Sequence, residues 1–146
     1  MPEQQTDNEK MLQEIVQNTE MGKNTLDEML GLAKDQKLKD EMMRQKREYR
    51  RINQQAHAAL DAIGAEAKGQ SAAARMSVSM GIRTRTMMDK SNRNLATMLA
   101  EGSGQGVLDC KRAASDYPEA SVGAQKLMQE LCDFQTQAEQ TWREFV

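Results

Sequence analysis

The sequence predicts a single all-helical domain, residues 1–146, built as a bundle of about four long helices. Strong helix formers (Ala, Leu, Met, Gln, Glu, Lys and Arg) dominate the chain. Aromatic residues make up only 3% of it, so the aromatic and β-branched alternation that strands need is almost absent. Apolar residues instead recur every three or four positions, the period of a helix that buries one face. A length of 146 residues suits one domain with one core.

The first helix is expected over about residues 7–34. Thr6 and Glu9 have the Thr-x-x-Glu spacing of a capping box, which satisfies the free backbone N–H groups at a helix start. The centre of the apolar stripe is weak, because Gly22 and Lys23 stand where large apolar residues are expected. The stripe comprises Leu12, Ile15, Thr19, Leu26, Met29, Leu30 and Ala33.

A second helix is expected over about residues 36–64. Asp35 is placed to cap its start, and Gly64 marks its end. The connection between the first two helices is short, so they are expected to form an antiparallel hairpin. The second stripe comprises Leu38, Met42, Gln45, Tyr49, Ile52, Ala56, Leu60 and Ile63.

Residues 65–83 are ambiguous from sequence. They begin with small and polar residues and end with spaced apolar ones. Two interpretations remain: a partly helical crossover that runs along the bundle, or the first turns of a very long third helix. Gly81 favours a break or a bend.

The third helix is expected over about residues 84–115. Residues 102–106 contain three glycines and resemble a loop in composition. The helical pattern resumes directly afterwards, which favours a continuous helix whose glycines let a neighbour approach closely, although each interior glycine costs about 1 kcal/mol relative to alanine. The expected buried side comprises Met87, Met88, Leu95, Met98, Leu99, Leu108 and Ala113.

The last helix is expected over about residues 118–145. Pro118 is favoured at a first helical position, which places the cap at Asp116 or Tyr117. The apolar stripe continues to the end of the sequence, so we expect the C-terminal turn to be docked. The stripe comprises Ala124, Leu127, Met128, Leu131, Phe134, Ala138, Trp142 and Phe145.

Charge and hydropathy indicate a cytoplasmic protein without a membrane or nucleic-acid partner. The net charge is −2 with both signs interspersed, and no apolar run approaches the roughly 20 residues of a membrane helix. The polar N-terminus has no signal-peptide core. Cys110 and Cys132 are widely spaced, so we expect reduced, buried thiols; a disulfide is the alternative if they face each other.

Two clusters suggest functions that simpler roles explain better. Soft sulfur ligands select Cu(I), but core packing accounts better for the five methionines between residues 76 and 98. The basic run from Arg44 to Arg51 suggests a phosphate or nucleic-acid surface, but acidic residues interleave with it, which favours a solvated helix face. The methionines are Met76, Met80, Met87, Met88 and Met98.

The layout of two helical hairpins and a longer connection resembles the ferritin-like superfamily, including its small bacterial members. Three stretches carry the resemblance: Asn18-Thr19-Glu20-Met21-Gly22, Met80-Gly81-Ile82 and Met98-Leu99-Ala100-Glu101-Gly102-Ser103. The resemblance implies an all-α, ferritin-like four-helix bundle.

The di-iron site of that superfamily needs one Glu from each of two helices and a Glu-x-x-His from each of the other two. The complete set is absent, because the one histidine, His57, follows Gln54 rather than a glutamate at that spacing. A degenerate, carboxylate-based site would draw on Glu20, Glu48, His57 and Glu130.

These observations favour a non-enzymatic structural or interaction module that self-associates or binds another protein. No acid, base and nucleophile converge in the pattern, and no cofactor motif is present. The alternative is a carboxylate-based iron or manganese protein. Thr19, Gly22 and Lys23, the polar centre of the first helix, are the best site candidate; otherwise Gly22 marks a tight helix crossing with Lys23 reaching outward.

Overall fold

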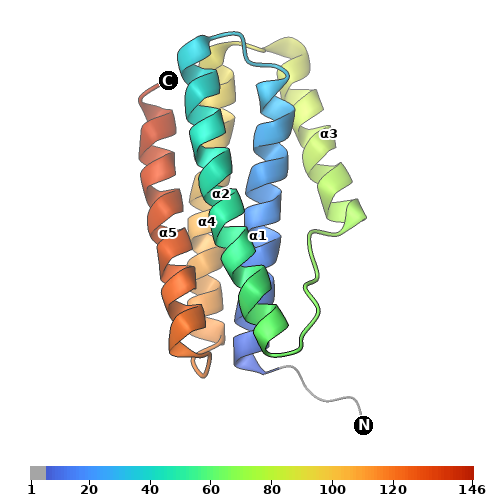
Figure 1. Ribbon diagram of the computed structural model, residues 1–146. Coiled ribbons are helices and arrows are strands. Elements are labelled where there is room, and N and C mark those ends of the chain that lie inside the picture. Colours follow the sequence, from blue (N-terminus) through green and yellow to red (C-terminus); the bar gives the residue numbers. More distant parts are fainter. Residues whose placement is uncertain (1–5) are drawn as a thin grey trace.

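The computed structural model describes residues 6–146, which form five α-helices (Figure 1). Four of them are long and lie side by side as a bundle, and the shorter α3 lies outside, against α1. None of the helices described is both long and apolar enough to cross a membrane. The helices are α1 (Asp7–Leu30), α2 (Gln36–Ala62), α3 (Ala72–Met88), α4 (Asn92–Asp116) and α5 (Val122–Arg143).

The bundle consists of two antiparallel hairpins, α1–α2 and α4–α5. Between them, residues 63–71 and α3 carry the chain back along the bundle, so that α4 starts at the same end as α2 (Figure 1). Helix α1 packs against α4 as well as α2, and α2 packs against α5. The predicted helical bundle is therefore confirmed, with five helices over the described residues instead of four.

Side-chain caps fix where the helices begin. The hydroxyl of Thr6 accepts a hydrogen bond from the backbone N–H of Glu9 (3.1 Å), and the carboxylate of Asp35 accepts one from the backbone N–H of Leu38 (2.9 Å). Gly64 follows α2 with φ +68°, a conformation that favours glycine. The predicted boundaries at these positions are confirmed, although α1 ends at Leu30, short of the expected residue 34.

The prediction of one third helix over residues 84–115 is wrong. Helix α3 ends at Met88, and α4 starts at Asn92. The carboxylate of Asp89 accepts a hydrogen bond from the backbone N–H of Ser91 (2.9 Å), and Ser91 then caps α4. The chain reverses at this turn, so residues 65–83 belong to a crossover with its own helix rather than to an extension of α4. Gly81 lies inside α3 and does not break it.

The predicted start of the last helix at Pro118 is also wrong. Ser121 caps α5, and its backbone N–H and hydroxyl both donate to the side-chain oxygen of Asn8 in the first turn of α1 (3.2 and 2.6 Å). This long-range contact stabilises a turn that delays the helix by about one turn relative to the proline. The end of α5 is docked as expected, because Trp142 is buried.

The core is aliphatic and rich in methionine, as predicted, and both cysteines are free and buried. Four methionines expected in the core, Met76, Met80, Met87 and Met88, are instead exposed, by 61% to 93%. They lie on α3, which buries only Ile82 and Thr86, because it sits outside the bundle. Two further residues that the stripes placed inside are also exposed, Ile63 and Leu108.

Residues 102–106 are helix interior, as the sequence favoured. Their glycines differ in surroundings: a Cβ on Gly102 would meet no atom within 4 Å, whereas a Cβ on Gly106 would lie 2.3 Å from the side-chain nitrogen of Gln135. Gly106 therefore provides space for α5, and Gly102 does not serve that purpose.

We predict that Gly102→Ala and Gly106→Ala shift the free energy of unfolding in opposite directions. Gly102→Ala should stabilise the protein by about 0.5–1 kcal/mol, because alanine restricts the unfolded chain without a clash. Gly106→Ala should destabilise it by about 1–3 kcal/mol, because the buried Gln135 must leave its hydrogen-bond partners. Urea unfolding curves measure both, and equal effects would contradict the assigned role of Gly106.

Candidate functional site

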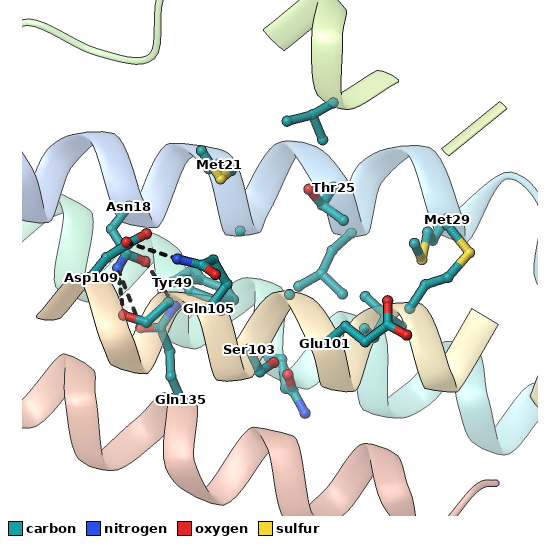
Figure 2. A pocket seen from close by; sticks show the side chains of 18 of the residues that line it. Asn18, Met21, Thr25, Met29, Tyr49, Glu101, Ser103, Gln105, Asp109 and Gln135 are labelled. Atoms are coloured by element: carbon teal, nitrogen blue, oxygen red, sulfur yellow. Dashed lines mark hydrogen bonds between the residues drawn. The ribbon is translucent and has the colours of Figure 1, made fainter. Parts of the chain in front are cut away.

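A cavity of about 620 Å³ lies between α1, α3 and α4, and side chains from α2 and α5 close its inner end. Its lining runs along α1 from Glu14 to Met29, which corresponds to about 22 Å of helix. The volume falls in the range of small-molecule sites. Figure 2 shows the amides of Asn18, Gln105 and Gln135 at one end, together with the carboxylate of Asp109, and Met29 at the opposite end, where Glu101 also lies.

The inner end of the cavity carries a polar floor, formed by Asn18, Tyr49, Ser103 and Gln135. The side-chain nitrogen of Gln135, a residue only 2% exposed, donates to Oδ1 of Asn18 (2.7 Å) and to the hydroxyl of Tyr49 (3.1 Å). The side-chain NH₂ group of Asn18 in turn donates to the backbone oxygen of Gly106 on α4 (3.3 Å). One hydrogen-bond network thus connects α1, α2, α4 and α5 (Figure 2).

Two glycines make room for the polar floor. A Cβ on Gly22 would lie 2.4 Å from the ring of Tyr49, and one on Gly106 would meet the amide of Gln135 at a similarly short distance. Neither position tolerates a side chain without a shift of its neighbour. The sequence interpretation of Gly22 as a tight helix crossing is confirmed, and Lys23 points outward to Asp27 (3.2 Å).

The polar floor is electrically neutral at physiological pH. Burial raises the pKa of the Tyr49 hydroxyl to about 12, so it stays protonated. Just behind the floor, burial raises the pKa of the Cys110 thiol to about 12 as well. The remaining groups are amides and a hydroxyl, which donate and accept hydrogen bonds without charge.

The wall beyond the floor combines apolar side chains with the polar side chains of Gln17, Thr25, Gln45 and Gln105, and α3 covers its outer side. Val78 and Ile82 of α3 line the cavity opposite Leu26, Met29 and Leu99. Because α3 buries so little of its own surface, few apolar contacts hold it in place.

The charged residues lie at the rim of the cavity, none of them buried. Arg85 of α3 forms an ion pair with Glu101 of α4, and the hydrogen bond from Arg85 holds the pKa of Glu101 below its usual value. Glu14 and Arg112 approach to 3.5 Å, and Asp109 accepts a hydrogen bond from Gln105 (3.1 Å). The rim charges thus have partners of their own.

The residues proposed as metal ligands lie apart from the cavity. Glu48 and Glu130 do come together, but both carboxylates bind the guanidinium of Arg51. Glu20 packs on Gly69 and accepts a hydrogen bond from the backbone N–H of Gln70 (2.6 Å). His57 is half-buried on α2. Among residues 6–146, no three His, Cys, Asp or Glu side chains are grouped to hold a metal ion.

Sequence reasoning found part of the site and missed the rest. Of the predicted polar centre of the first helix, Gly22 lines the cavity, whereas Thr19 and Lys23 do not. Asn18 and Gln135 were not among the site candidates. A signal for Gln135 was present: it stands four residues after Leu131 and seven before Trp142, inside the apolar stripe of α5. A polar residue at such a position needs a buried partner.

Comparisons of this chain with protein-family models, with curated proteins and with solved structures give no match. The function of the site is therefore argued from its geometry. That geometry offers neutral hydrogen-bonding groups at one end of an apolar cavity, which suits binding and orientation of a small molecule.

We predict that Gln135→Leu lowers the free energy of unfolding by about 1–3 kcal/mol. The change keeps the side chain similar in size but leaves the buried hydroxyl of Tyr49 and the amide of Asn18 without their partner. Gln137→Leu, an exposed position on the same helix, should change stability by less than about 0.5 kcal/mol. Urea unfolding compares the two, and an equal loss would show that Gln135 has no special structural role.

We predict that Cys110 resists alkylation in the folded protein. With a pKa of about 12, only about one thiol in 10⁴ is ionised at pH 8, roughly a thousandfold less than for a free cysteine. In a Cys132→Ser variant, iodoacetamide labelling followed by mass spectrometry should be at least that much slower than for a cysteine-containing peptide. Unfolding in urea should restore the rate, and fast labelling of the folded variant would contradict the burial of the thiol.

Proposed function

We propose that this protein is a non-enzymatic binding module with a ferritin-like bundle, which holds a small, largely apolar molecule in the cavity beneath α3. The observation that carries the proposal is the cavity itself. It combines about 620 Å³ of space, apolar wall residues such as Leu26, Met29 and Ile82, and a neutral polar floor at one end. Pockets that bind small molecules have this composition, with few polar groups that fix the orientation of the ligand.

The ferritin-like assignment draws support from the chain path and from the position of the resembling stretches. The two hairpins are joined by a connection that runs along the bundle, which is the crossover arrangement found in ferritin-like folds. The three stretches that carry the resemblance all contribute to the cavity lining, through Asn18, Gly22, Ile82, Met98 and Ser103 among others. The resemblance and the proposed site therefore concern the same residues.

A binding role fits these groups better than catalysis. The buried thiol of Cys110 has a raised pKa, which opposes the thiolate that a nucleophile requires. The carboxylate-based iron or manganese site is the weaker proposal, because Arg51 already neutralises Glu48 and Glu130. A guanidinium between two carboxylates would repel a metal cation.

We predict that the folded protein binds the neutral apolar dye N-phenyl-1-naphthylamine with one site per chain. Dye fluorescence should rise on binding, and the fluorescence of Trp142, the single tryptophan, should be quenched because it lines the cavity. Gly102→Leu should weaken binding at least tenfold, because its side chain enters open space in the cavity. Fluorescence titration measures both signals.

Gln137→Leu adds a leucine of the same size outside the cavity and should bind the dye normally. Equal dye binding by both leucine variants, or no binding at all, would overturn the proposal. Thermal unfolding with added manganese or iron tests the alternative. A rise in Tm that Glu20→Gln or Glu130→Gln abolishes would favour the metal-binding function instead.

A further inference from the structure

The polar floor has hydrogen-bonding capacity that its internal contacts use poorly. The side-chain NH₂ group of Asn18 faces two oxygen acceptors at the long end of the hydrogen-bond range, the backbone oxygen of Gly106 (3.3 Å) and Oε1 of Gln135 (3.4 Å). Its third acceptor is Sγ of Cys110 (3.5 Å), and a thiol sulfur accepts hydrogen bonds only weakly. Asn18 lines the cavity and is only half-buried. An oxygen atom of a ligand at this end would accept a shorter and stronger hydrogen bond from the same NH₂ group.

The floor discriminates by charge. A carboxylate placed there would leave water without finding a cation, because Tyr49 and Cys110 stay neutral and the remaining floor groups are amides and a hydroxyl. An ammonium group would find only the rim carboxylates of Asp109 and Glu14, which already bind Gln105 and Arg112. The nearest cations, Arg85 and Arg112, lie at the exposed rim beside carboxylates. Burying an unpaired ion is strongly unfavourable, whereas an uncharged polar group would exchange one set of hydrogen bonds for another.

The cavity is also directional. The amides of Asn18, Gln105 and Gln135 lie at one end, and the lining then continues past Thr25 to Met29, with the carboxylate of Glu101 toward that second end (Figure 2). Between the two ends, apolar side chains from α1, α3 and α4 contribute to the lining. The distance along α1 from Asn18 to Met29 is about 16 Å of helix. This length accommodates a hydrocarbon chain or a flat apolar skeleton that lies parallel to the helix.

We infer that the ligand is a neutral amphiphile, whose uncharged carbonyl, amide or hydroxyl group lies at the polar floor and whose apolar part runs along α1 toward Met29. This inference rests on the proposed function, since it names the ligand class of the same cavity. Asn18 donates to the oxygen of the head group, and Gln135 holds Asn18 in place through the hydrogen bond to Oδ1. The methionines and leucines of the wall select for an apolar body but not for one exact shape.

Competition between eight-carbon compounds of equal chain length tests the inference. In the experiment, the dye N-phenyl-1-naphthylamine is bound to the protein at neutral pH and titrated with one competitor at a time. The competitors are octanamide, octan-1-ol, octanoate and octylammonium, and the dissociation constant of each is measured. Octanamide and octan-1-ol should bind at least tenfold more tightly than the two ions, which corresponds to about 1.4 kcal/mol. Equal affinities across the series would overturn the ligand class while dye binding still upheld the proposed function; no dye binding would reject the function itself.

Binding to the Asn18→Leu variant tests whether the head group of the ligand lies at Asn18. The substitution should weaken octanamide binding about tenfold and leave dye and octanoate binding within about twofold, because only the neutral head group uses Asn18. Asn92→Leu makes the same change on the exposed start of α4 and should alter nothing. Unchanged octanamide affinity in a folded Asn18→Leu variant would contradict the proposed orientation.

Asn18→Asp provides a second variant in case the leucine change impairs folding. A carboxylate at position 18 would introduce a negative charge into the floor, so octylammonium should gain affinity relative to octanamide. Circular dichroism confirms that each variant is folded before titration. A ratio of the two affinities that does not change would show that the head groups do not reach position 18.

Discussion

The buried amide of Gln135 is the interaction on which the interior of this bundle depends. It connects α5 to Asn18 of α1 and to Tyr49 of α2, and it occupies the space that Gly106 of α4 leaves. Hydrogen bonds in a low-dielectric interior are strong when complete and costly when broken. The two hairpins are therefore fixed in relative height by a polar contact, whereas apolar packing alone would tolerate sliding.

The same contact creates the cavity. Gly22 and Gly106 bring the floor residues close together, and the space between α1 and α4 beyond them stays unfilled by large side chains. Helix α3 covers this space with Val78 and Ile82 and leaves its methionines in solvent. A bundle helix would bury a full apolar stripe; α3 buries only two residues, and this places it among the elements that open at the lowest free-energy cost.

Sequence reasoning failed where a local preference competed with a distant contact. Pro118 has a strong preference for a first helical position. However, Oδ1 of Asn8 accepts hydrogen bonds from the backbone N–H and the hydroxyl of Ser121, and the helix starts after Ser121 instead. The methionines of α3 have helical spacing, and spacing alone does not show that four other helices already form the core. At residues 102–106 composition suggested a loop, yet the flanking periodicity correctly predicted a helix.

The sequence by itself determined the helical class, the first hairpin, the caps at Thr6 and Asp35 and the aliphatic core, because these depend on contacts between residues close in the chain and on hydrophobic periodicity. Only the tertiary structure decided that residues 72–88 form a separate helix, that Glu48 and Glu130 share Arg51, and that a cavity with a neutral floor exists. These features arise from side chains such as Asn18 and Gln135, 117 positions apart, whose meeting is set by how the helices pack. No pattern within a single helix predicts that two residues so far apart in the sequence are in contact.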